Sequence, residues 1–497
     1  MKPLPGNVAE YHVENFGCRA SRSDGESIAA TLREHGMEAA EDPSAARVVV
    51  VNTCSVTAEA DRQARAYVRR LRRQNPAARI LVTGCYAQRA PQELAALPEV
   101  DAVVGNSHKA LVADMALRLA AASPAPPGYA HSSIPPDAHS LSPLDAQSSF
   151  VSLATILHDD RFAHSELATL PFAADARQTR PNLKVQDGCG NRCSFCIIPT
   201  TRGHSRSIPL GDCLASVRRF VDRGGIELVL SGINLGRWGR DLQTPQRFQD
   251  LVAAILTETA LPRLRLSSIE PMDWSADLLA LYREFATGPH PRLARHTHLP
   301  LQSGSDAILR RMHRRYRPWH YAERLAKIRE LLPAAAIGAD VMIGFPGETD
   351  SLFHESYRFI AAQPFTYLHL FPFSARPATP AWELHRQNPV PPRAVQDRMA
   401  ALRSLIAGKS RSFREPFVGL SLSAVTVEPG TDPGTTDAVT DNFLKLTLDT
   451  AIPPNRLIEA RVSGLTQEGL CGTHGNSNCS AEAASGQGLP ASKFDER

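Results

Sequence analysis

Three cysteines lie close together in one short segment. Cys189, Cys193 and Cys196 are spaced C-x3-C-x2-C in a stretch rich in Gly and Asn that follows an apolar run. Thiolates are the ligands that iron–sulfur clusters use, and a four-iron cluster held by three of them leaves one iron without a protein ligand. That iron can bind the amino and carboxylate groups of S-adenosylmethionine and pass an electron to its sulfonium. The spacing predicts a catalytic 4Fe–4S cluster and radical chemistry.

A structural zinc site is the alternative for these thiols. Zinc in such sites takes four ligands in a closed tetrahedron, usually with C-x2-C pairs. His204 lies near enough in the sequence to be the fourth ligand. The chain therefore leaves two metal assignments for the same three cysteines, with different consequences for function.

Three further cysteines are far apart in the sequence, but each lies at the same position relative to a predicted strand. Cys18, Cys54 and Cys85 each follow a short apolar run that predicts a strand, namely residues 11–16, 47–51 and 80–83. Carboxyl ends of neighbouring parallel strands share one edge of a sheet. We therefore expect these thiols to converge on a second iron–sulfur cluster. Cys213 is expected in the core, and Cys471 and Cys479 receive no role.

Length and composition limit the class of protein. A chain of 497 residues, 43% hydrophobic, is expected to form about three globular domains. No apolar stretch of about 18 residues predicts a membrane span, and the N-terminus lacks a secretory pattern. We expect a cytoplasmic protein with no membrane partner, in which nine cysteines serve metal binding or catalysis rather than disulfides. The net charge of +4 is too small to identify a partner.

Alternating apolar runs and helical patterns predict the elements that position the second cysteine group. Helices are expected at 25–35 and 58–73, between the strands named above and a further strand at 100–104. This alternation indicates an α/β domain with a doubly wound parallel sheet over residues 8–118. Residues 119–178 predict a flexible Pro/Ser-rich insertion with a short helix near 151–157.

The C-x3-C-x2-C segment opens a second α/β region, expected over residues 179–405. Helical segments are predicted at 211–223, 248–257, 319–332 and 351–362, between β-rich runs. Strand–helix units of this kind fit a partial (β/α)6 barrel with catalytic loops beyond the carboxyl ends of its strands. The expected strands are 183–186, 226–231, 264–269, 297–302, 339–343 and 367–371.

The end of the chain changes to an all-β pattern. After a basic helix at 393–414, runs at 418–427, 438–439, 443–448 and 457–462 predict a small barrel over 416–467. Residues 472–497 are rich in Gly, Ser, Asn and Ala and are predicted to be a disordered tail.

These features together resemble the radical S-adenosylmethionine methylthiotransferase family. The resemblance covers residues 8–118 and 180–466 and rests on motifs containing the six cysteines and on three later segments. It implies an N-terminal domain with an auxiliary cluster, a radical S-adenosylmethionine barrel and an RNA-binding β-barrel called TRAM. The segments are Gly17–Cys18, Asn52–Thr57, Gly84–Gln88, the Cys189–Cys196 loop, Leu266–Pro271, His298–Gly304 and Asp340–Thr349.

The resemblance also implies a reaction. Leu230–Gly236 is similar to the branch that methylthiolates C2 of N6-threonylcarbamoyladenosine beside the tRNA anticodon. Alternatives are the same chemistry on N6-dimethylallyladenosine or on a ribosomal protein aspartate. In the family, one S-adenosylmethionine methylates sulfur on the first cluster, and a second is cleaved to a 5′-deoxyadenosyl radical. Such an enzyme needs two 4Fe–4S clusters, tRNA, an external electron donor and a sulfur source that the sequence does not identify.

For S-adenosylmethionine, the resemblance implies contacts at the strand ends of the barrel. Many radical enzymes have Gly-Gly-Glu after the second strand, whereas this chain has Gly-Ile-Asn, which changes the group offered to the methionine amine. Any of these polar residues could instead cap a strand. The implied contacts are Phe195, Gly232, Asn234, Ser268, Glu270, Gln302 and Gly344.

Arginine clusters predict where RNA would bind. A predicted helix at 58–73 carries several arginines, and residues 310–317 form a second basic run. The predicted C-terminal β domain is more acidic than basic, so tRNA is expected to bind mainly to the arginine stretches. The different-class alternative is a non-catalytic, metal-stapled RNA-binding protein. The helical arginines are Arg62, Arg65, Arg69, Arg70, Arg72 and Arg73.

Overall fold

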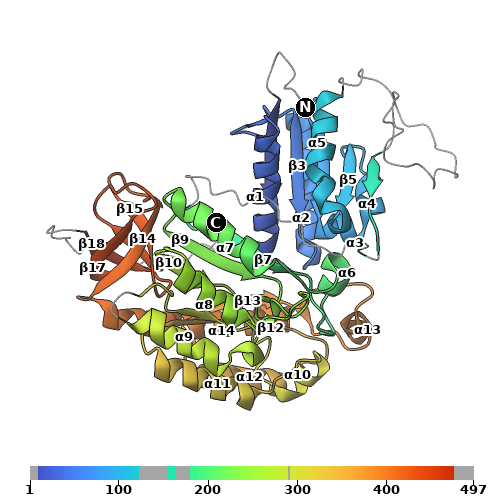
Figure 1. Cartoon of the computed structure of the whole chain (residues 1–497). Helices are drawn as coiled ribbons and strands as arrows, with labels where there is room; N and C mark the ends of the chain where they lie inside the picture. Colours follow the sequence, from blue (N-terminus) through green and yellow to red (C-terminus); the bar gives the residue numbers. More distant parts are fainter. Residues whose placement is uncertain (1–8, 123–153, 161, 163–178, 289–290, 475–497) are drawn as a thin grey trace. The chain divides into compact units, whose positions relative to one another are not determined.

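The structure is a computed structural model that describes residues 9–122, 154–160, 162, 179–288 and 291–474 (Figure 1). The chain divides into two compact units, Met1–Ser410 and Arg411–Arg497. The two α/β regions that the sequence predicts as separate domains therefore belong to the same compact unit. The boundary expected between these two regions, at residues 118–179, is still a prediction.

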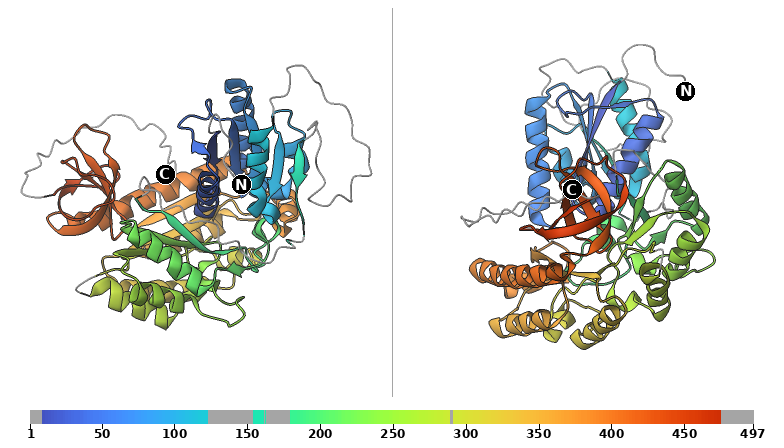
Figure 2. Two further views of the ribbon diagram at one scale, coloured as in Figure 1. Left: turned by 45° about the horizontal axis from the view of Figure 1, so that its top comes forward. Right: turned by 90° about the vertical axis from the view of Figure 1, so that its left-hand side faces the viewer.

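A parallel six-stranded sheet forms the N-terminal part of the first unit, in the order β2-β1-β3-β4-β5-β6. Helices connect the strands on both sides, as Figure 2 shows. The strands are β1 (Glu10–Asn15), β2 (Glu38–Ala39), β3 (Val48–Thr53), β4 (Arg79–Gly84), β5 (Ala102–Gly105) and β6 (Thr155–Leu157). The helices are α1 (Arg19–Glu34), α2 (Ala58–Gln74), α3 (Cys85–Arg89), α4 (Pro91–Ala95) and α5 (Val112–Ala121), with a 3-10 turn at Asn106–Leu111.

The fully buried run of β3 explains the two helical layers. Successive strand side chains point to opposite faces of a sheet, so a strand covered on both sides is apolar throughout. Val49 and Val51 pack on the face covered by α2, whereas Val48 and Val50 pack on the face covered by α1 and α5. The predicted doubly wound parallel sheet is confirmed.

Six parallel strands of the second region form the partial barrel. They pair as β7-β9-β10 and β11-β12-β13, with a parallel bridge from Leu264 to Leu293 between the two groups. The strands are β7 (Asn182–Asp187), β9 (Glu227–Gly232), β10 (Arg263–Leu266), β11 (His296–His298), β12 (Ala336–Ile343) and β13 (Tyr367–Pro372), with a short antiparallel β8 (Arg206–Ser207) beside β7.

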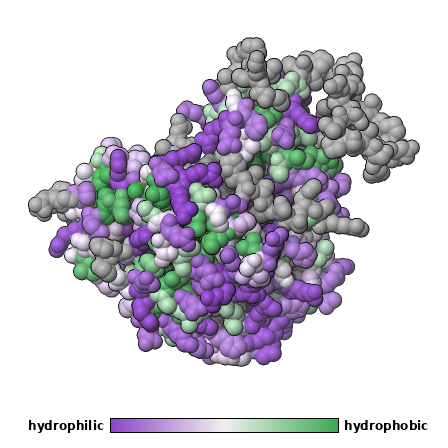
Figure 3. Space-filling model, viewed as in Figure 1, coloured by the Kyte–Doolittle hydropathy of each residue, from purple (hydrophilic) through white to green (hydrophobic). Residues whose placement is uncertain are grey.

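Helices cover the outer side of these strands (Figure 1). Their apolar faces and the strands form one core that contains Trp238, Trp274 and Tyr321. The helices are α6 (Ile198–Arg202), α7 (Leu210–Asp222), α8 (Phe248–Glu258), α9 (Ala276–Thr287), α10 (Asp306–Arg311), α11 (Pro318–Leu331), α12 (Asp350–Ala362), α13 (Pro380–Gln387) and α14 (Pro392–Arg414), with 3-10 turns at Leu235–Arg237 and Pro271–Asp273. Over α9 to α12 the visible surface is mostly hydrophilic (Figure 3). Within the described residues, none of the helices has the length and hydropathy to span a bilayer.

The second unit contains a closed five-stranded barrel in the order β14-β15-β16-β18-β17. The predicted TRAM-like β-barrel is thereby confirmed. Its strands are β14 (Ser421–Pro429), β15 (Thr436–Thr440), β16 (Lys445–Leu448), β17 (Leu457–Leu465) and β18 (Leu470–Thr473), after a 3-10 turn at Glu415–Phe417.

Two local predictions are wrong. The helix expected near 151–157 overlaps β6, because Thr155–Leu157 pairs in parallel with β5 and completes the sheet edge. Residues 472 and 473, expected in the disordered tail, belong to β18, which pairs with β16 and β17 and includes Cys471. Most of the predicted insertion and the tail beyond residue 474 lie outside the described residues.

Candidate active site with two groups of three cysteines

The first cysteine group lies on the loop between β7 and α6. Gly188 turns the chain with a φ of +74° directly after β7, and the Cys189 amide donates to the Gly203 carbonyl at 3.0 Å. Burial is the main cause that raises the pKa of Cys196 to about 12, and the nearby Cys193 and Cys189 sulfurs raise it further. The loop therefore brings the three thiols together in a buried place, where binding iron would displace their protons.

Polar groups of the barrel surround these sulfur atoms. The Cys189 sulfur accepts from the Asn234 side-chain amide at 3.5 Å and from the Asn191 backbone N–H at 3.4 Å. Arg314 donates through Nη1 to the Cys193 sulfur at 3.3 Å. A cavity of about 290 Å³ adjoins them and is lined by Cys193, Glu270 and Arg314 among others. The site thus pairs thiols with N–H donors and opens onto space for a ligand.

Arg314 is a site residue that the sequence did not identify. It lies in the basic run at 310–317, where we expected phosphate contacts, yet it is only 7% exposed. Its guanidinium pairs with the Glu270 carboxylate as well as with the Cys193 sulfur. The sequence shows only that residue 314 is an arginine, and this does not reveal whether the side chain is buried beside the cysteine loop or exposed at the surface. The expectation that Arg314 contacts an RNA phosphate at the surface is therefore wrong.

Two buried side-chain amides of the barrel region have unsatisfied acceptors. Asn234 Oδ1 and Gln302 Oε1 have no hydrogen-bond partner within the described part of the chain, although both residues are buried. Buried acceptors without a partner are costly, so such atoms mark a place for a donor. The ammonium group of S-adenosylmethionine is a donor of this kind. Asn234 and Gln302 therefore fit the expected cofactor contacts.

The other residues expected to contact S-adenosylmethionine lie at different places in the barrel region. Ser268 lies 3.0 Å through its hydroxyl from His298 Nδ1, and Phe195 packs against an apolar cluster that includes Met312 and Phe345. Gly232 lies at the end of β9, where a Cβ would come 3.0 Å from the Gln186 side chain. Gly344, with a φ of +79°, donates its N–H to Glu348 at 2.8 Å. None of these four lines the cavity beside Cys193.

The second cysteine group lies at the carboxyl edge of the N-terminal sheet. Cys18 precedes α1, Cys54 follows β3, and Cys85 begins α3 directly after β4. Burial, with smaller effects of the Cys18 and Cys85 sulfurs, raises the pKa of Cys54 to about 12. The expected convergence at one sheet edge is therefore what the fold produces.

Gly17 makes this convergence possible. Its φ of +102° belongs to the left-handed region, which side chains rarely adopt, and a Cβ there would lie 2.7 Å from the Cys54 sulfur. The glycine thus allows the loop that carries Cys18 to approach Cys54 closely.

A buried ion cluster, defined here as Asp24, Lys109, Lys184, Asp187 and Arg202, joins the N-terminal sheet to the barrel. Arg202 Nη1 lies 3.1 Å from Asp24 and 3.0 Å from Asp187, while both lysines also contact Asp24. Burial lowers the pKa of Arg202, but Asp187 first, and then the Cys85 sulfur, Asp24 and the Cys18 sulfur, raise it above its ordinary range. The ion cluster therefore places a permanent positive charge beside the second thiol group.

The sulfur spacing bears on the choice between zinc and an iron–sulfur cluster. In neither thiol group of the described chain do all three sulfurs lie within 4.8 Å of one another. A zinc tetrahedron with Zn–S bonds of about 2.3 Å has edges of roughly 3.8 Å. His204, the suggested fourth zinc ligand, is exposed. The donor set and its spacing fit a larger cluster better than a single zinc ion.

The arginines of α2 divide into two kinds. Arg72 forms an ion pair with Asp101 at 2.7 Å and donates hydrogen bonds to backbone carbonyls, and Arg65 donates to the Tyr86 hydroxyl. Arg69 and Arg73 lie on the exposed face of the helix, together with Arg70. Only the exposed members of the predicted stripe are available to a phosphate backbone.

Two family descriptions match this chain. Residues 10–105 match the uncharacterized protein family UPF0004, and this match spans β1 to β5 of the N-terminal sheet with Cys18, Cys54 and Cys85. Residues 183–360 match the radical SAM superfamily and include the C-x3-C-x2-C loop. Both cysteine groups therefore fall inside matched regions.

Curated relatives match most of the chain. It is 32% identical over 443 residues to the threonylcarbamoyladenosine tRNA methylthiotransferase MtaB of Bacillus subtilis, covering 88% of this chain and 90% of the relative. It is 33% identical to the protein of the same name from Aquifex aeolicus, covering 84% and 92%. A tRNA-2-methylthio-N(6)-dimethylallyladenosine synthase from Acidothermus cellulolyticus is 31% identical, covering 93% and 84%.

A solved structure supports the fold. The radical S-adenosylmethionine methyltransferase TsrM from Kitasatospora setae, with cobalamin and a [4Fe-4S] cluster bound, gives a TM-score of 0.53 at 13% identity. The match covers 77% of this chain and 78% of that one, and at this identity it speaks for the fold alone. With the relatives above, which match along nearly their whole length, this chain belongs to the MtaB-type radical S-adenosylmethionine methylthiotransferase family.

Proposed function

We propose that this protein adds a methylthio group to C2 of N6-threonylcarbamoyladenosine beside the anticodon of tRNA. The observation that carries the proposal is the pair of buried to half-buried three-cysteine groups in one compact unit, each of which suits a thiolate-ligated cluster. The names of the relatives from Bacillus subtilis and Aquifex aeolicus support the substrate.

Members of this family use S-adenosylmethionine and iron–sulfur chemistry, and we propose two 4Fe–4S clusters for this chain. Cys189, Cys193 and Cys196 would hold one, and the group formed by Cys18, Cys54 and Cys85 would hold the other. When bound, these groups supply reductive cleavage of S-adenosylmethionine and a carrier for the transferred sulfur. An external electron donor and a source of sulfur complete the requirements.

Residues of the chain would orient S-adenosylmethionine and offset the negative charge of the thiolates. Asn234 donates one amide hydrogen to Cys189 and keeps its oxygen free for the methionine ammonium, with Gln302 offering a second acceptor. Arg314 places a guanidinium between Cys193 and Glu270, which offsets thiolate charge in a buried place.

We propose that the exposed arginines of α2 contact the tRNA backbone. Replacing Arg69 and Arg70 together by Glu should weaken tRNA binding and reduce its salt dependence by about two released counterions. Arg223→Glu, an exposed arginine after α7, is the matched control. Unchanged affinity and salt slope in the double variant would exclude this surface.

Nucleoside mass spectrometry tests the reaction. Reconstituted protein is incubated anaerobically with tRNA, S-adenosylmethionine and a strong reductant, and a methylthio group on threonylcarbamoyladenosine is expected. Product on dimethylallyladenosine alone, as the name of the Acidothermus relative suggests, would keep the chemistry and change the substrate. Cleavage of S-adenosylmethionine with no modified nucleoside would direct the search to a protein aspartate.

Single cysteine variants separate the two groups. Cys193→Ala should abolish formation of 5′-deoxyadenosine, whereas Cys54→Ala should keep this cleavage and lose methylthio transfer. Cys471→Ser, in the C-terminal barrel, is the control and should leave both activities unchanged. Full methylthio transfer by Cys54→Ala would refute the role of the second group.

A further inference from the structure

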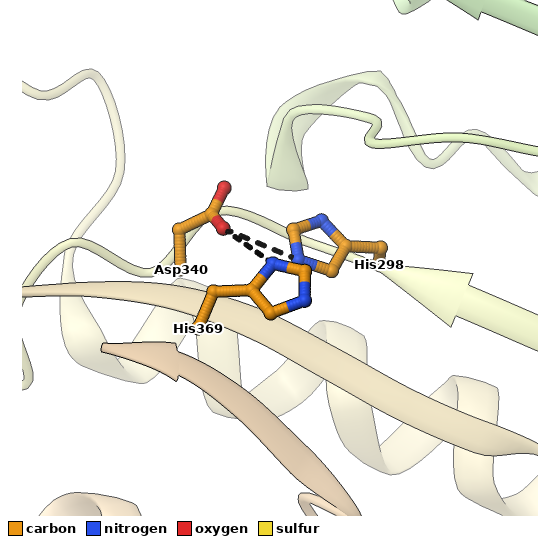
Figure 4. A group of neighbouring side chains, drawn as sticks. All are labelled: His298, Asp340 and His369. Atoms are coloured by element: carbon orange, nitrogen blue, oxygen red, sulfur yellow. Dashed lines mark hydrogen bonds and ion pairs between the residues drawn. The ribbon is translucent and has the colours of Figure 1, made fainter. Parts of the chain in front are cut away.

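Three potential metal ligands lie side by side on the last three barrel strands, outside both cysteine groups. His298 ends β11, Asp340 lies within β12 and His369 lies within β13. Asp340 and His369 are direct partners in the parallel pairing of their strands, which places their side chains on one face of the sheet. Figure 4 shows the three side chains pointing toward one another.

The spacing of the ligand atoms matches a metal polyhedron. Asp340 Oδ1 lies 3.4 Å from His298 Nε2 and 3.2 Å from His369 Nδ1. All three ligand atoms lie within 4.8 Å of one another. Nitrogen and oxygen ligands at about 2.0–2.2 Å from zinc are separated by roughly 3.4 Å in a tetrahedron. Small side-chain rotations would therefore place one ion at bonding distance from all three.

His298 is oriented as a ligand would be. The residue is only 6% exposed, and its Nε2 atom faces the other two side chains, with Asp340 Oδ1 at 3.4 Å. Its Nδ1 atom lies 3.0 Å from the Ser268 hydroxyl. Metal-binding histidines commonly use the second ring nitrogen in this way, which fixes the ring and directs the other lone pair at the ion.

The charge and access of the group also suit a cation. Asp340 offers a carboxylate between the two imidazoles, and its side chain is 27% exposed. The His369 side chain is 47% exposed, which gives an ion a path from solvent. Water or a substrate oxygen could occupy positions that the three side chains leave open.

We propose that His298, Asp340 and His369 bind one divalent transition-metal ion in addition to the clusters on the cysteines. Two imidazoles and one carboxylate suit zinc or iron(II), and such sites keep open coordination positions. The site is independent of the assigned tRNA substrate, because it rests on the ligand geometry alone.

Zinc binding to the cluster-loaded protein tests the proposal. Protein with both clusters assembled is dialysed anaerobically against dilute Zn²⁺, and zinc and iron are counted together by mass spectrometry. The protein is expected to bind about one zinc per chain more tightly, by at least about tenfold, than His369→Ala or Asp340→Asn. His354→Ala, which removes an exposed histidine of α12, is the matched control and should keep the zinc.

X-ray absorption at the zinc edge locates the bound ion. Nitrogen and oxygen neighbours at about 2.0–2.1 Å are expected, without sulfur at about 2.3 Å. Because His369 is the exposed member, its replacement spares the core, and unchanged iron content and thermal unfolding will verify this. Sulfur neighbours, no bound zinc, or equal zinc in the wild type and the His369→Ala protein would overturn the proposal.

Discussion

Replacing Asp24 by Asn tests whether the buried ion cluster holds the N-terminal sheet on the barrel. Asp24 is fully buried and contacts three cations, Lys109, Lys184 and Arg202. Together with Asp187, the cluster has three positive and two negative charges. The variant keeps the side-chain shape but leaves three cations facing one carboxylate.

The expected loss of unfolding free energy in Asp24→Asn follows from the burial of the charges that remain. At an effective dielectric constant of about 20, one pair of charges 3.1 Å apart, as for Arg202 and Asp24, contributes roughly 5 kcal/mol of Coulomb energy. Much of that energy offsets desolvation, yet removing one partner of a buried pair costs about 3–5 kcal/mol because the other charge stays buried. At about 2–4 °C per kcal/mol, the melting temperature should fall by about 6–20 °C.

Thermal unfolding and hydrogen exchange of the cluster-loaded protein provide the measurement. Faster exchange is expected in α1 and β7, which carry Asp24 and Lys184. Asp114→Asn, an exposed aspartate on α5, is the control and should change the melting temperature little. The double variant Asp24→Asn/Lys109→Gln restores the net charge of the ion cluster and should recover part of the loss. A melting temperature within about 2 °C of wild type for Asp24→Asn would refute the reasoning.

Three further outcomes are expected. Gly17→Ala should lower the free energy of unfolding by about 1–3 kcal/mol and reduce the iron content. Gly36 also has a positive φ but has open space around it, so Gly36→Ala should keep its iron. Equal iron loss in both variants would contradict the steric argument. Glu227→Gln should destabilise by about 3–5 kcal/mol in thermal unfolding, because Arg265 loses a fully buried counter-ion. Although burial raises it, the pKa of Glu227 is brought to about 2 mainly by Arg265, so its stabilisation is present above about pH 4.5 and lost as the pH falls toward 2. The wild-type and variant stability curves should therefore converge in acid, and parallel curves would contradict the assignment. Asn234→Ala should weaken S-adenosylmethionine binding at least about tenfold in equilibrium dialysis, and unchanged affinity would exclude Asn234 as a contact.

Long apolar runs made the sheet framework predictable from the sequence. Val48–Val51 is buried on both faces, so its composition alone indicates a central parallel strand. Thr155–Leu157 lacked such a signal, because a three-residue edge strand is recognisable only by its pairing with β5. The convergence of Cys18, Cys54 and Cys85 followed from the shared position of strand ends, which is a topological property rather than a local one.

Burial of polar groups was the part that the sequence could not predict. Arg314 belongs to a run of arginines whose other members face different surroundings, and only the tertiary fold brings it to Cys193. His298, Asp340 and His369 are far apart in the chain and form no spacing motif. Their proximity depends on strand register, which a single sequence does not specify.

The segment from Cys196 to Arg202 connects the two cysteine groups. It begins with a thiol of the barrel loop and ends, after one helical turn, with a guanidinium that faces Asp24 and the sulfurs of the N-terminal sheet. Ordering this segment by iron at one site would therefore raise the affinity of the other, and the effect must be reciprocal. We expect cluster assembly to be coupled, so that preparations with too little iron contain fewer single-cluster molecules than independent binding would give.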